Sequence, residues 1–280
     1  MIKGSTGLVG LLGNPVKHSL SPVMQNAALD ATGLDWRYLA LPCEESQLRI
    51  VLEGMHAVNC RGLNVTIPHK QSVANICAEL SPLAERLGAV NTLLPLAKGG
   101  WHGTNTDVEG FLAPLGKREL WQGKKAVVIG CGGSARAVVA GLQTLQLQMV
   151  HVIGRRAEVL SQFVADLQQV DAPLHAITDQ NPSIRRVIET ADLVVNTTPV
   201  GVSQHGDPSA MPLGNELWED LPPRAIVYDL IYTPRPTAWL AQAADRGHLC
   251  FDGLEMLVQQ GASALRLWSG QQDVPVPTMR

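Results

Sequence analysis

Short, unbroken runs of apolar residues alternate with stretches of helical periodicity through the middle of the chain. We predict strands at 126–129, 149–153, 193–195 and 225–228, and helices at 135–145 and 157–167. Continuous strands rich in valine and isoleucine, separated by helices, are typical of a parallel sheet that is buried on both faces. The pattern therefore predicts a doubly wound α/β domain over residues 108–252.

The first hundred residues also mix strands with helices. Strands fit residues 7–12, 36–41 and 62–67, and helices fit residues 22–31, 45–55 and 69–79. Near the other end of the chain, residues 254–268 carry apolar side chains at close to helical spacing. This last helix is placed to pack back onto the first hundred residues, so we expect a second α/β domain there.

The composition is typical of a globular protein and disfavours a nucleic-acid-binding or membrane-spanning one. The chain has 280 residues, of which 45% are apolar and 17% charged, as in a globular protein with ordinary cores. The net charge is −3 and no long run of lysine or arginine occurs, so we expect no nucleic-acid partner. No apolar stretch has the length of a membrane span, and residues 7–13 are better interpreted as a strand than as a signal peptide. A cytoplasmic protein is expected.

The cysteines do not form a recognisable framework. Five are present, scattered along the chain with no C-x-x-C pair: Cys43, Cys60, Cys77, Cys131 and Cys250. An odd, dispersed set favours reduced thiols over disulfides or a zinc site. We expect no metal.

A glycine-rich turn lies between the first predicted strand of the middle region and the helix after it. Its G-x-G-x-x-A pattern in a strand–turn–helix context indicates a dinucleotide site, although an ordinary tight turn is the alternative. Gly130 allows the turn, Gly132 lets the backbone approach a pyrophosphate, and the small Ala135 lets helix and strand pack closely. The candidate cofactor-binding residues here are Gly130, Gly132, Gly133, Ser134 and Ala135.

The second predicted strand of that domain ends in Gly154-Arg155-Arg156. An acidic residue here would accept hydrogen bonds from the ribose of NAD, whereas arginines suit the 2′-phosphate of NADP. We therefore predict NADP(H) with Arg155 and Arg156 as its contacts; an exposed loop without a ligand is the alternative.

Two serines lie one residue apart near the start of the chain. In an extended segment Ser19 and Ser21 share one side, where two hydroxyls and the N–H groups of the following helix suit a carboxylate. The alternative is that Ser21 serves as the N-cap of a helix that begins at Pro22.

A lysine follows a strand with polar side chains on one face. Asn64 and Thr66 alternate with apolar neighbours, Pro68 ends the strand, and Lys70 falls in the first turn of the next predicted helix. The positive end of a helix dipole disfavours a cation there, which suits a lysine that transfers protons. A solvated surface lysine is the alternative.

Two polar segments follow, Gly88–Thr92 and Gly103–Asp107. Asp107 is a candidate partner that positions and polarises Lys70, and Asn91 is a candidate for hydrogen bonds to a hydroxylated substrate. Each of them singly is most often a turn residue.

Taken together and in this order, these segments resemble the shikimate dehydrogenase family over nearly the whole chain. The segments that carry the resemblance are Ser19–Pro22, Asn64–Lys70, Gly88–Thr92, Gly103–Asp107, the glycine turn, Asn196–Gly201, Tyr228–Pro234 and Asp252–Leu257.

The resemblance implies reversible, NADPH-dependent reduction of 3-dehydroshikimate to shikimate, a step in aromatic amino-acid biosynthesis. It implies a Rossmann-like NADP-binding domain at 108–252, a discontinuous substrate-binding domain at 1–107 plus 253–280, and a cleft between them. Lys70 becomes the catalytic acid/base assisted by Asp107. The resemblance implies the substrate-binding residues Ser19, Ser21, Asn64, Thr66, Asn91, Tyr232 and Gln260. It also implies that Thr198 and Gly253 are further cofactor-binding residues.

Two other functions stay open. One is an NAD-dependent quinate/shikimate dehydrogenase, which the missing acidic residue at the ribose position disfavours. The other is a non-catalytic NADPH-sensing relative, which is expected to lack Lys70 or Asp107. The family commonly has Asn-Arg-Thr where this chain has Gly154-Arg155-Arg156, so Arg155 keeps its place while the role of Arg156 is less defined. A monomer or a homodimer is expected.

Overall fold

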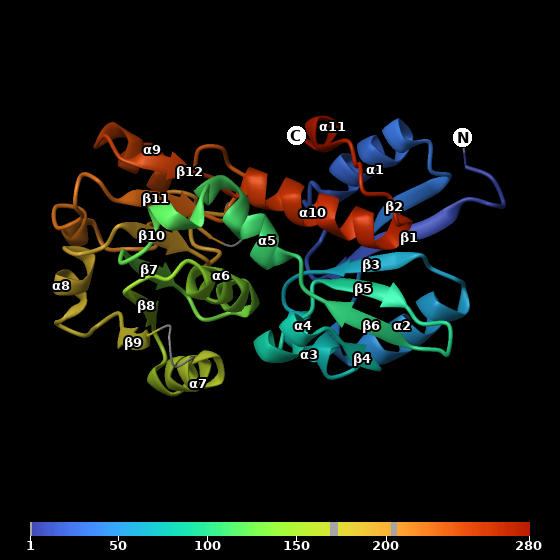
Figure 1. Cartoon of the computed structure of the whole chain (residues 1–280), viewed down its shortest axis with the longest axis horizontal. Helices are drawn as coiled ribbons and strands as arrows, with labels where there is room; N and C mark the ends of the chain where they lie inside the picture. Colours follow the sequence, from blue (N-terminus) through green and yellow to red (C-terminus); the bar gives the residue numbers. More distant parts are fainter. Residues whose placement is uncertain (1, 169–172, 203–205) are drawn as a thin grey trace. The chain divides into compact units, whose positions relative to one another are not determined.

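The computed structural model describes residues 2–168, 173–202 and 206–280. The chain forms two compact units. The first unit contains Met1–Gly110 and Leu257–Arg280, and the second contains Phe111–Met256. Each unit contains one six-stranded sheet, which gives the α/β class expected from the sequence (Figure 1).

All strand pairs in the sheet of the second unit are parallel. The strand order is β12-β11-β10-β7-β8-β9, the order of a doubly wound dinucleotide-binding fold. Its strands are β7 (Lys125–Ile129), β8 (Met149–Gly154), β9 (Leu174–Thr178), β10 (Leu193–Asn196), β11 (Ile226–Asp229) and β12 (Leu249–Phe251). The helices are α6 (Gly133–Thr144), α7 (Ala157–Leu167), α8 (Ile184–Ile188) and α9 (Ala238–Asp245).

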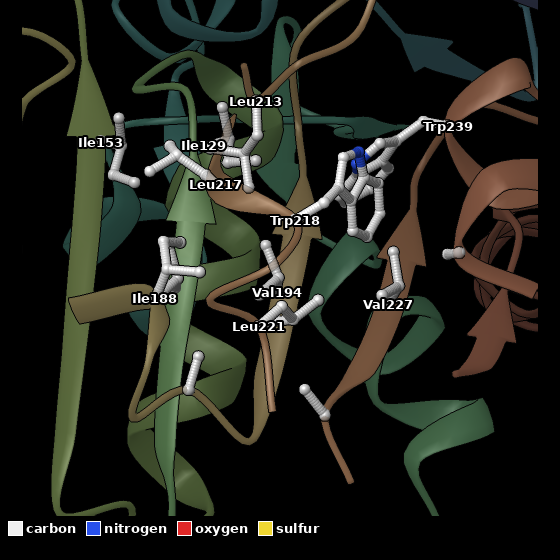
Figure 2. Close-up of a cluster of buried hydrophobic side chains, with 14 of the residues drawn as sticks. Ile129, Ile153, Ile188, Val194, Leu213, Leu217, Trp218, Leu221, Val227 and Trp239 are labelled. Atoms are coloured by element: carbon white, nitrogen blue, oxygen red, sulfur yellow. The ribbon is translucent and has the colours of Figure 1, made fainter. Parts of the chain in front are cut away.

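The core of this unit explains why its strands are continuous apolar runs. Val194 and Val227, from neighbouring strands, are completely buried and pack in one cluster with Ile129 (Figure 2). Trp218 and Trp239 close the cluster, with ring centroids 5.9 Å apart. A parallel strand covered on both faces has no solvent side, so no polar alternation is visible in its sequence.

The sheet of the first unit is mixed. Its order is β2-β1-β3-β5-β6-β4, where β1 pairs parallel with β2 and β3 while β5 runs antiparallel to β3 and β6. The strands are β1 (Gly7–Gly13), β2 (Trp36–Pro42), β3 (Gly62–Val65), β4 (Glu79–Leu80), β5 (Thr92–Pro95) and β6 (Trp101–Thr104). The helices that begin in this unit are α1 (Ser21–Thr32), α2 (Leu48–Ala57), α3 (Lys70–Ala74), α4 (Pro82–Leu87), α5 (Asp107–Leu112) and α11 (Val276–Met279).

The last long helix is α10 (Gly253–Ser269), which belongs to the first unit from Leu257 onward. Within the first unit, the side chain of Gln25 donates to the carbonyl of Gly261 at 2.9 Å, and the Trp268 indole donates to the carbonyl of Leu93 at 3.0 Å. None of the described helices is both long enough and apolar enough to cross a membrane.

The sequence pattern was least informative for short elements. The helix predicted at 69–79 is only α3 (Lys70–Ala74), and the helix predicted at 45–55 divides into a 3-10 turn (Glu45–Gln47) and α2. Short elements such as β4 and β6 were not predicted, because two to four residues do not establish a period.

Gly62 is required by a close approach and not by its backbone angle. A Cβ atom at Gly62 would overlap the indole ring of Trp268, which is held by its hydrogen bond to Leu93. We expect Gly62→Ala to lower the free energy of unfolding by about 1–3 kcal/mol, as overpacking does. Gly54→Ala is the matched control, because a Cβ there meets nothing and alanine favours helix α2 by roughly 1 kcal/mol. Urea unfolding measures both; equal effects would contradict the packing argument.

Candidate functional site

Strand register in the first unit brings the polar segments to one edge of the sheet. Asn64 lies opposite Thr92, and Thr92 lies opposite Thr104. The residues after β3, before β5 and after β6 therefore emerge together. These segments carry Lys70, Asn91 and Asp107.

Lys70 and Asp107 form a buried ion pair. The Lys70 Nζ donates to Asp107 Oδ2 at 2.6 Å, and the side chains are only 10% and 6% exposed. The other carboxylate oxygen of Asp107 accepts from the Asn91 amide at 2.8 Å. Both oxygens thus have a donor, which a charge removed from water requires. The predicted pairing of Asp107 with Lys70 is present in the structure.

A second layer of hydrogen bonds fixes Asn91 and Asp107 in place. The backbone N–H of Thr106 donates to the Asn91 amide oxygen at 2.8 Å. The backbone N–H of Asp107, the first residue of α5, donates to the Asn105 side chain at 3.0 Å, and Asn105 in turn donates to the carbonyl of Ala89 at 3.0 Å. The carboxylate position is therefore defined by backbone groups before β5 and after β6.

Lys70 lies in the first turn of a helix, as expected, but the structure weakens the argument from the helix dipole. Helix α3 has five residues, and its N-cap His69 makes no side-chain capping bond. A helix of this length has a small dipole, so the Asp107 carboxylate 2.6 Å away dominates the electrostatics at Lys70. His69 instead holds the turn, through a ring nitrogen 2.6 Å from the carbonyl oxygen of Cys43.

Asn64 is more enclosed than the sequence indicated. Its amide oxygen accepts from the Tyr38 hydroxyl at 2.8 Å, and its NH₂ group donates to the Asn91 carbonyl and the Thr92 hydroxyl, both at 3.2 Å. Tyr38 was not identified from the sequence, because it lies 26 residues away on β2 and resembles an ordinary strand aromatic. Asn64 has one acceptor position left for a further donor.

Two further predicted residues lie at the same edge. Thr66 comes directly after β3 and is half-buried; its backbone N–H donates to Leu12 at 2.9 Å. Gln260, on α10, donates to the carbonyl of Leu257 at 2.7 Å and accepts a long hydrogen bond of 3.4 Å from Asn91. The structure thus brings Gln260 to Asn91 across 169 residues of sequence.

The alternative interpretation, in which Ser21 is the N-cap of a helix that begins at Pro22, is wrong. Helix α1 begins at Ser21, and its N-cap position is Leu20, which already has helical backbone angles. The helix therefore starts one residue earlier than Pro22 suggested. The hydroxyl oxygen of Ser19 accepts the N–H of Ser21 at 3.2 Å, so Ser19 caps the turn. Ser21 is buried and Ser19 half-buried.

In the second unit the glycine turn has the predicted geometry. Gly130 has φ +105°, and a Cβ there would lie 2.6 Å from the Thr197 hydroxyl, so glycine is required. Helix α6 begins at Gly133 with Gly132 as its N-cap, and Ala135 is completely buried against the strand. Gly133 and Ser134 form the first turn, whose N–H groups suit an anion.

The turn has open space at Gly132. A Cβ at Gly132 would meet no described atom within 4 Å, so the described chain itself does not demand glycine there and room is left for a phosphate. Gly130 donates to the carbonyl of Ile153 at 2.8 Å, which brings the end of β8 beside the turn. Arg155 and Arg156 follow at once and are exposed. Residues of the kind that hold a 2′-phosphate are therefore at the expected edge.

The remaining predicted residues of this unit follow β10, β11 and β12. Thr198 donates its hydroxyl to the Asn196 side chain at 2.7 Å. Tyr232 is half-buried in the segment after β11. Gly253 packs so closely on the carbonyl of Leu230 that a Cβ would overlap it. Tyr232 belongs to the second unit, whereas the other predicted ring residues belong to the first.

The described residues include no group of metal ligands, and burial strongly affects the pKa of two of the thiols. Within the described ranges, no three His, Cys, Asp or Glu side chains form a group that could hold a metal ion. All five cysteines are free thiols, as predicted. Burial raises the pKa of Cys60 to about 11 and that of Cys77 to about 12, so both stay protonated at neutral pH.

Two family models and several known proteins match this chain. A family model for the shikimate dehydrogenase substrate binding domain matches residues 11–93, and one for the shikimate 5'-dehydrogenase C-terminal domain matches residues 253–280. Shikimate dehydrogenase (NADP(+)) from Synechocystis sp. is 49% identical, over 100% of this chain and 95% of its own length. The protein of the same name from Prochlorococcus marinus strain MIT 9515 is 43% identical, over 100% and 97%.

A solved structure agrees. Shikimate 5-dehydrogenase from Thermus thermophilus, in complex with NADP(H) and shikimate, superposes with a TM-score of 0.83 and 36% identity, over 98% of this chain and 97% of that one.

The buried ion pair predicts a stability effect. Asp107→Asn leaves the Lys70 ammonium buried without a counter-charge, so the free energy of unfolding is expected to fall by about 3 kcal/mol. Asp30→Asn is the control, because Asp30 pairs with Arg37 at 3.0 Å while 64% exposed, and should cost less than about 1 kcal/mol. Urea unfolding at pH 7 compares them; a loss at Asp107 no larger than that at Asp30 contradicts the pairing energetics.

Proposed function

The chain belongs to the shikimate dehydrogenase family, and we propose that it catalyses the reversible, NADPH-dependent reduction of 3-dehydroshikimate to shikimate. The observation that carries this proposal is the buried Lys70–Asp107 pair, with Nζ and Oδ2 2.6 Å apart at the polar edge of the first sheet. We assign substrate binding to the first unit and NADP(H) binding to the second.

Reduction of a ketone adds a hydride to carbon and a proton to oxygen. Bound NADP(H) would supply or accept the hydride. Lys70 donates its proton to the developing alkoxide during reduction, and it takes the proton from the hydroxyl in the reverse direction. As a buried ammonium it also stabilises negative charge on that oxygen more strongly than it would in water.

Asp107 acts on the reaction through Lys70. Its carboxylate holds the ammonium in one position, while the Asn91 amide at 2.8 Å holds the carboxylate. A proton donor fixed before the substrate arrives avoids the entropy cost of orienting a flexible lysine chain.

The substrate has a carboxylate and hydroxyls to be recognised. Ser19 and Ser21 are assigned to the carboxylate; Ser19 accepts the N–H of Ser21, and its own hydroxyl hydrogen is the donor for the anion. The residues assigned to the ring are Asn64, Thr66, Asn91, Tyr232 and Gln260. Asn64 contributes as an acceptor, because its two N–H donors are already used.

The cofactor is assigned to the glycine turn and the arginines after β8. The N-terminal N–H groups of α6, from Gly132 to Ala135, bind the pyrophosphate, and Gly130 allows the turn. Arg155, with Arg156, binds the 2′-phosphate. Thr198, which follows β10, and Gly253, which follows β12, complete the set.

The alternatives have distinct outcomes in one assay. Purified protein is mixed with shikimate and NADP⁺, and absorbance of the reduced cofactor is followed. Rapid formation of NADPH supports the proposal. Faster turnover with NAD⁺ and quinate identifies the quinate/shikimate enzyme, and cofactor binding without turnover of either acid identifies a sensing protein.

Lys70 is expected to act mainly in the chemical step. Its interaction with the substrate oxygen strengthens as charge develops, so Lys70→Ala should lower kcat by roughly 100-fold or more, with a smaller change in KM. Steady-state kinetics with shikimate and NADP⁺ measure this. A near-normal kcat with a strongly raised KM would make Lys70 a binding residue.

Arg155 is expected to decide the choice of cofactor. Its guanidinium gains a charged hydrogen bond from the 2′-phosphate and nothing comparable from a ribose hydroxyl. Arg155→Ala should therefore weaken NADP⁺ binding by about 1.5–3 kcal/mol and leave NAD⁺ nearly unchanged. The effect should shrink at high salt. Binding titrations with both cofactors test it; equal losses for the two would assign Arg155 to the fold alone.

A further inference from the structure

Asp229 is a buried carboxylate that takes no part in the chemistry proposed above. It ends β11 and is completely buried. One oxygen accepts from the Asn196 side chain at 3.0 Å and from the backbone N–H of Ile231 at 3.1 Å. The other oxygen accepts from the Thr237 hydroxyl at 2.8 Å. Three donors therefore converge on one carboxylate at the edge of the sheet where the glycine turn lies.

On one side this network reaches a residue assigned to the cofactor. The Asn196 amide gives its NH₂ group to Asp229, so its oxygen is left to accept from Thr198. It accepts from both the Thr198 backbone N–H, at 3.0 Å, and the Thr198 hydroxyl, at 2.7 Å. Asp229 thus determines which way the Asn196 amide faces, and Asn196 holds Thr198.

On the other side the network brackets the segment that carries Tyr232. Ile231 is bound at the start of the segment, and Thr237 at its end. Thr237 is also the N-cap of α9, since its hydroxyl oxygen accepts from the Leu240 N–H at 3.2 Å. Both ends of the segment 230–237 are therefore tied to the same carboxylate.

The segment 230–237 also contacts Gly253. The backbone N–H of Gly253 donates to the carbonyl of Ile231 at 3.1 Å, and the carbonyl of Leu230 lies against the glycine Cα. Arg235 of the segment pairs with Asp252, the residue before Gly253. A shift of the segment would therefore move Tyr232 and Gly253 together.

We propose that Asp229 is a positioning residue, whose ionised carboxylate aligns Tyr232 for the substrate and Thr198 for the cofactor. This rests on the proposed function. Two acceptor oxygens are needed to satisfy three donors. Protonation of the oxygen that faces Asn196 and Ile231 would oppose two N–H donors. Protonation of the other oxygen would reverse the bond to Thr237, whose hydroxyl would then accept from both the acid and Leu240 and lose the acceptor for its own hydrogen.

Asp229 is ionised at a cost to the fold. Burial raises the pKa of Asp229 to about 6, with a smaller contribution from Asp252; its three hydrogen bonds oppose the rise. Its partners from β10 and α9, Asn196 and Thr237, are uncharged. Because the folded-state pKa lies above the ordinary value, the carboxyl favours the folded state in acid, and this contribution is lost as pH rises through about 6. A buried charge that costs stability at neutral pH is typical of a functional position.

The test compares Asp229→Asn with Asp192→Asn in the full-length protein. Asp192 is the matched control, since it precedes β10 at the opposite end and accepts from the Lys125 N–H and Arg224, each at 3.0 Å. We expect kcat/KM for shikimate to be about 10-fold lower in Asp229→Asn than in the control at pH 7.5, the loss of one hydrogen bond to a charged group. The ratio should approach one at pH 5, with a midpoint near pH 6. A ratio that is one at pH 7.5, or constant from pH 5 to 8, overturns the proposal.

Thr237 provides a second test should Asp229→Asn fail to fold. Thr237→Val removes the hydroxyl with little change of shape and should lower kcat/KM, whereas Thr237→Ser should recover it. Equal kinetics of the two variants overturn the proposal. Inactivity of the wild type toward shikimate would refute the proposed function instead. In that case, titration of both variants with NADP⁺ tests the positioning role of Asp229. Weaker NADP⁺ binding by Asp229→Asn than by Asp192→Asn supports this role, and equal binding overturns it.

Discussion

One buried ion pair organises the polar edge of the first sheet. Lys70 and Asp107 are both nearly inaccessible to water, so their charges are tolerated only because each is matched by the other and by further hydrogen bonds. Asn91 satisfies the second carboxylate oxygen, and the backbone of Thr106 orients Asn91. The antiparallel register of β5 with β3 and β6 is what brings these three segments together.

The second unit places its candidate site residues by the same kind of constraint. Parallel strands emerge at one edge, so the glycine turn after β7 and the segments after β10 and β11 become neighbours. Asn196 lies in register with both Ile129 and Asp229, which connects the glycine turn to the segment that carries Tyr232. Backbone geometry sets the turn through Gly130, and a buried carboxylate holds the segment.

Sequence patterns identified what depends on local spacing. Helix α7 was predicted with its bounds, and the four central strands of the second sheet, β7, β8, β10 and β11, were predicted because their apolar runs are continuous. The outer strands β9 and β12 were not predicted. The N-terminal boundary of α1 was wrong, because the backbone at Leu20 turns before Pro22. Tyr38 against Asn64 and Asn196 against Asp229 were not predicted. Those contacts join residues 26 and 33 positions apart, and only the strand pairing specifies them.

The central claim is that Lys70 and Asp107 work as one unit, and a double-mutant cycle tests it most directly. Lys70→Ala, Asp107→Ala and the double variant are compared with wild type by kcat for shikimate oxidation with NADP⁺. If the carboxylate acts only through the ammonium, its removal costs nothing further once Lys70 is absent, so the double variant should match Lys70→Ala. Losses that add in free energy would show that the two residues act independently and would contradict the account.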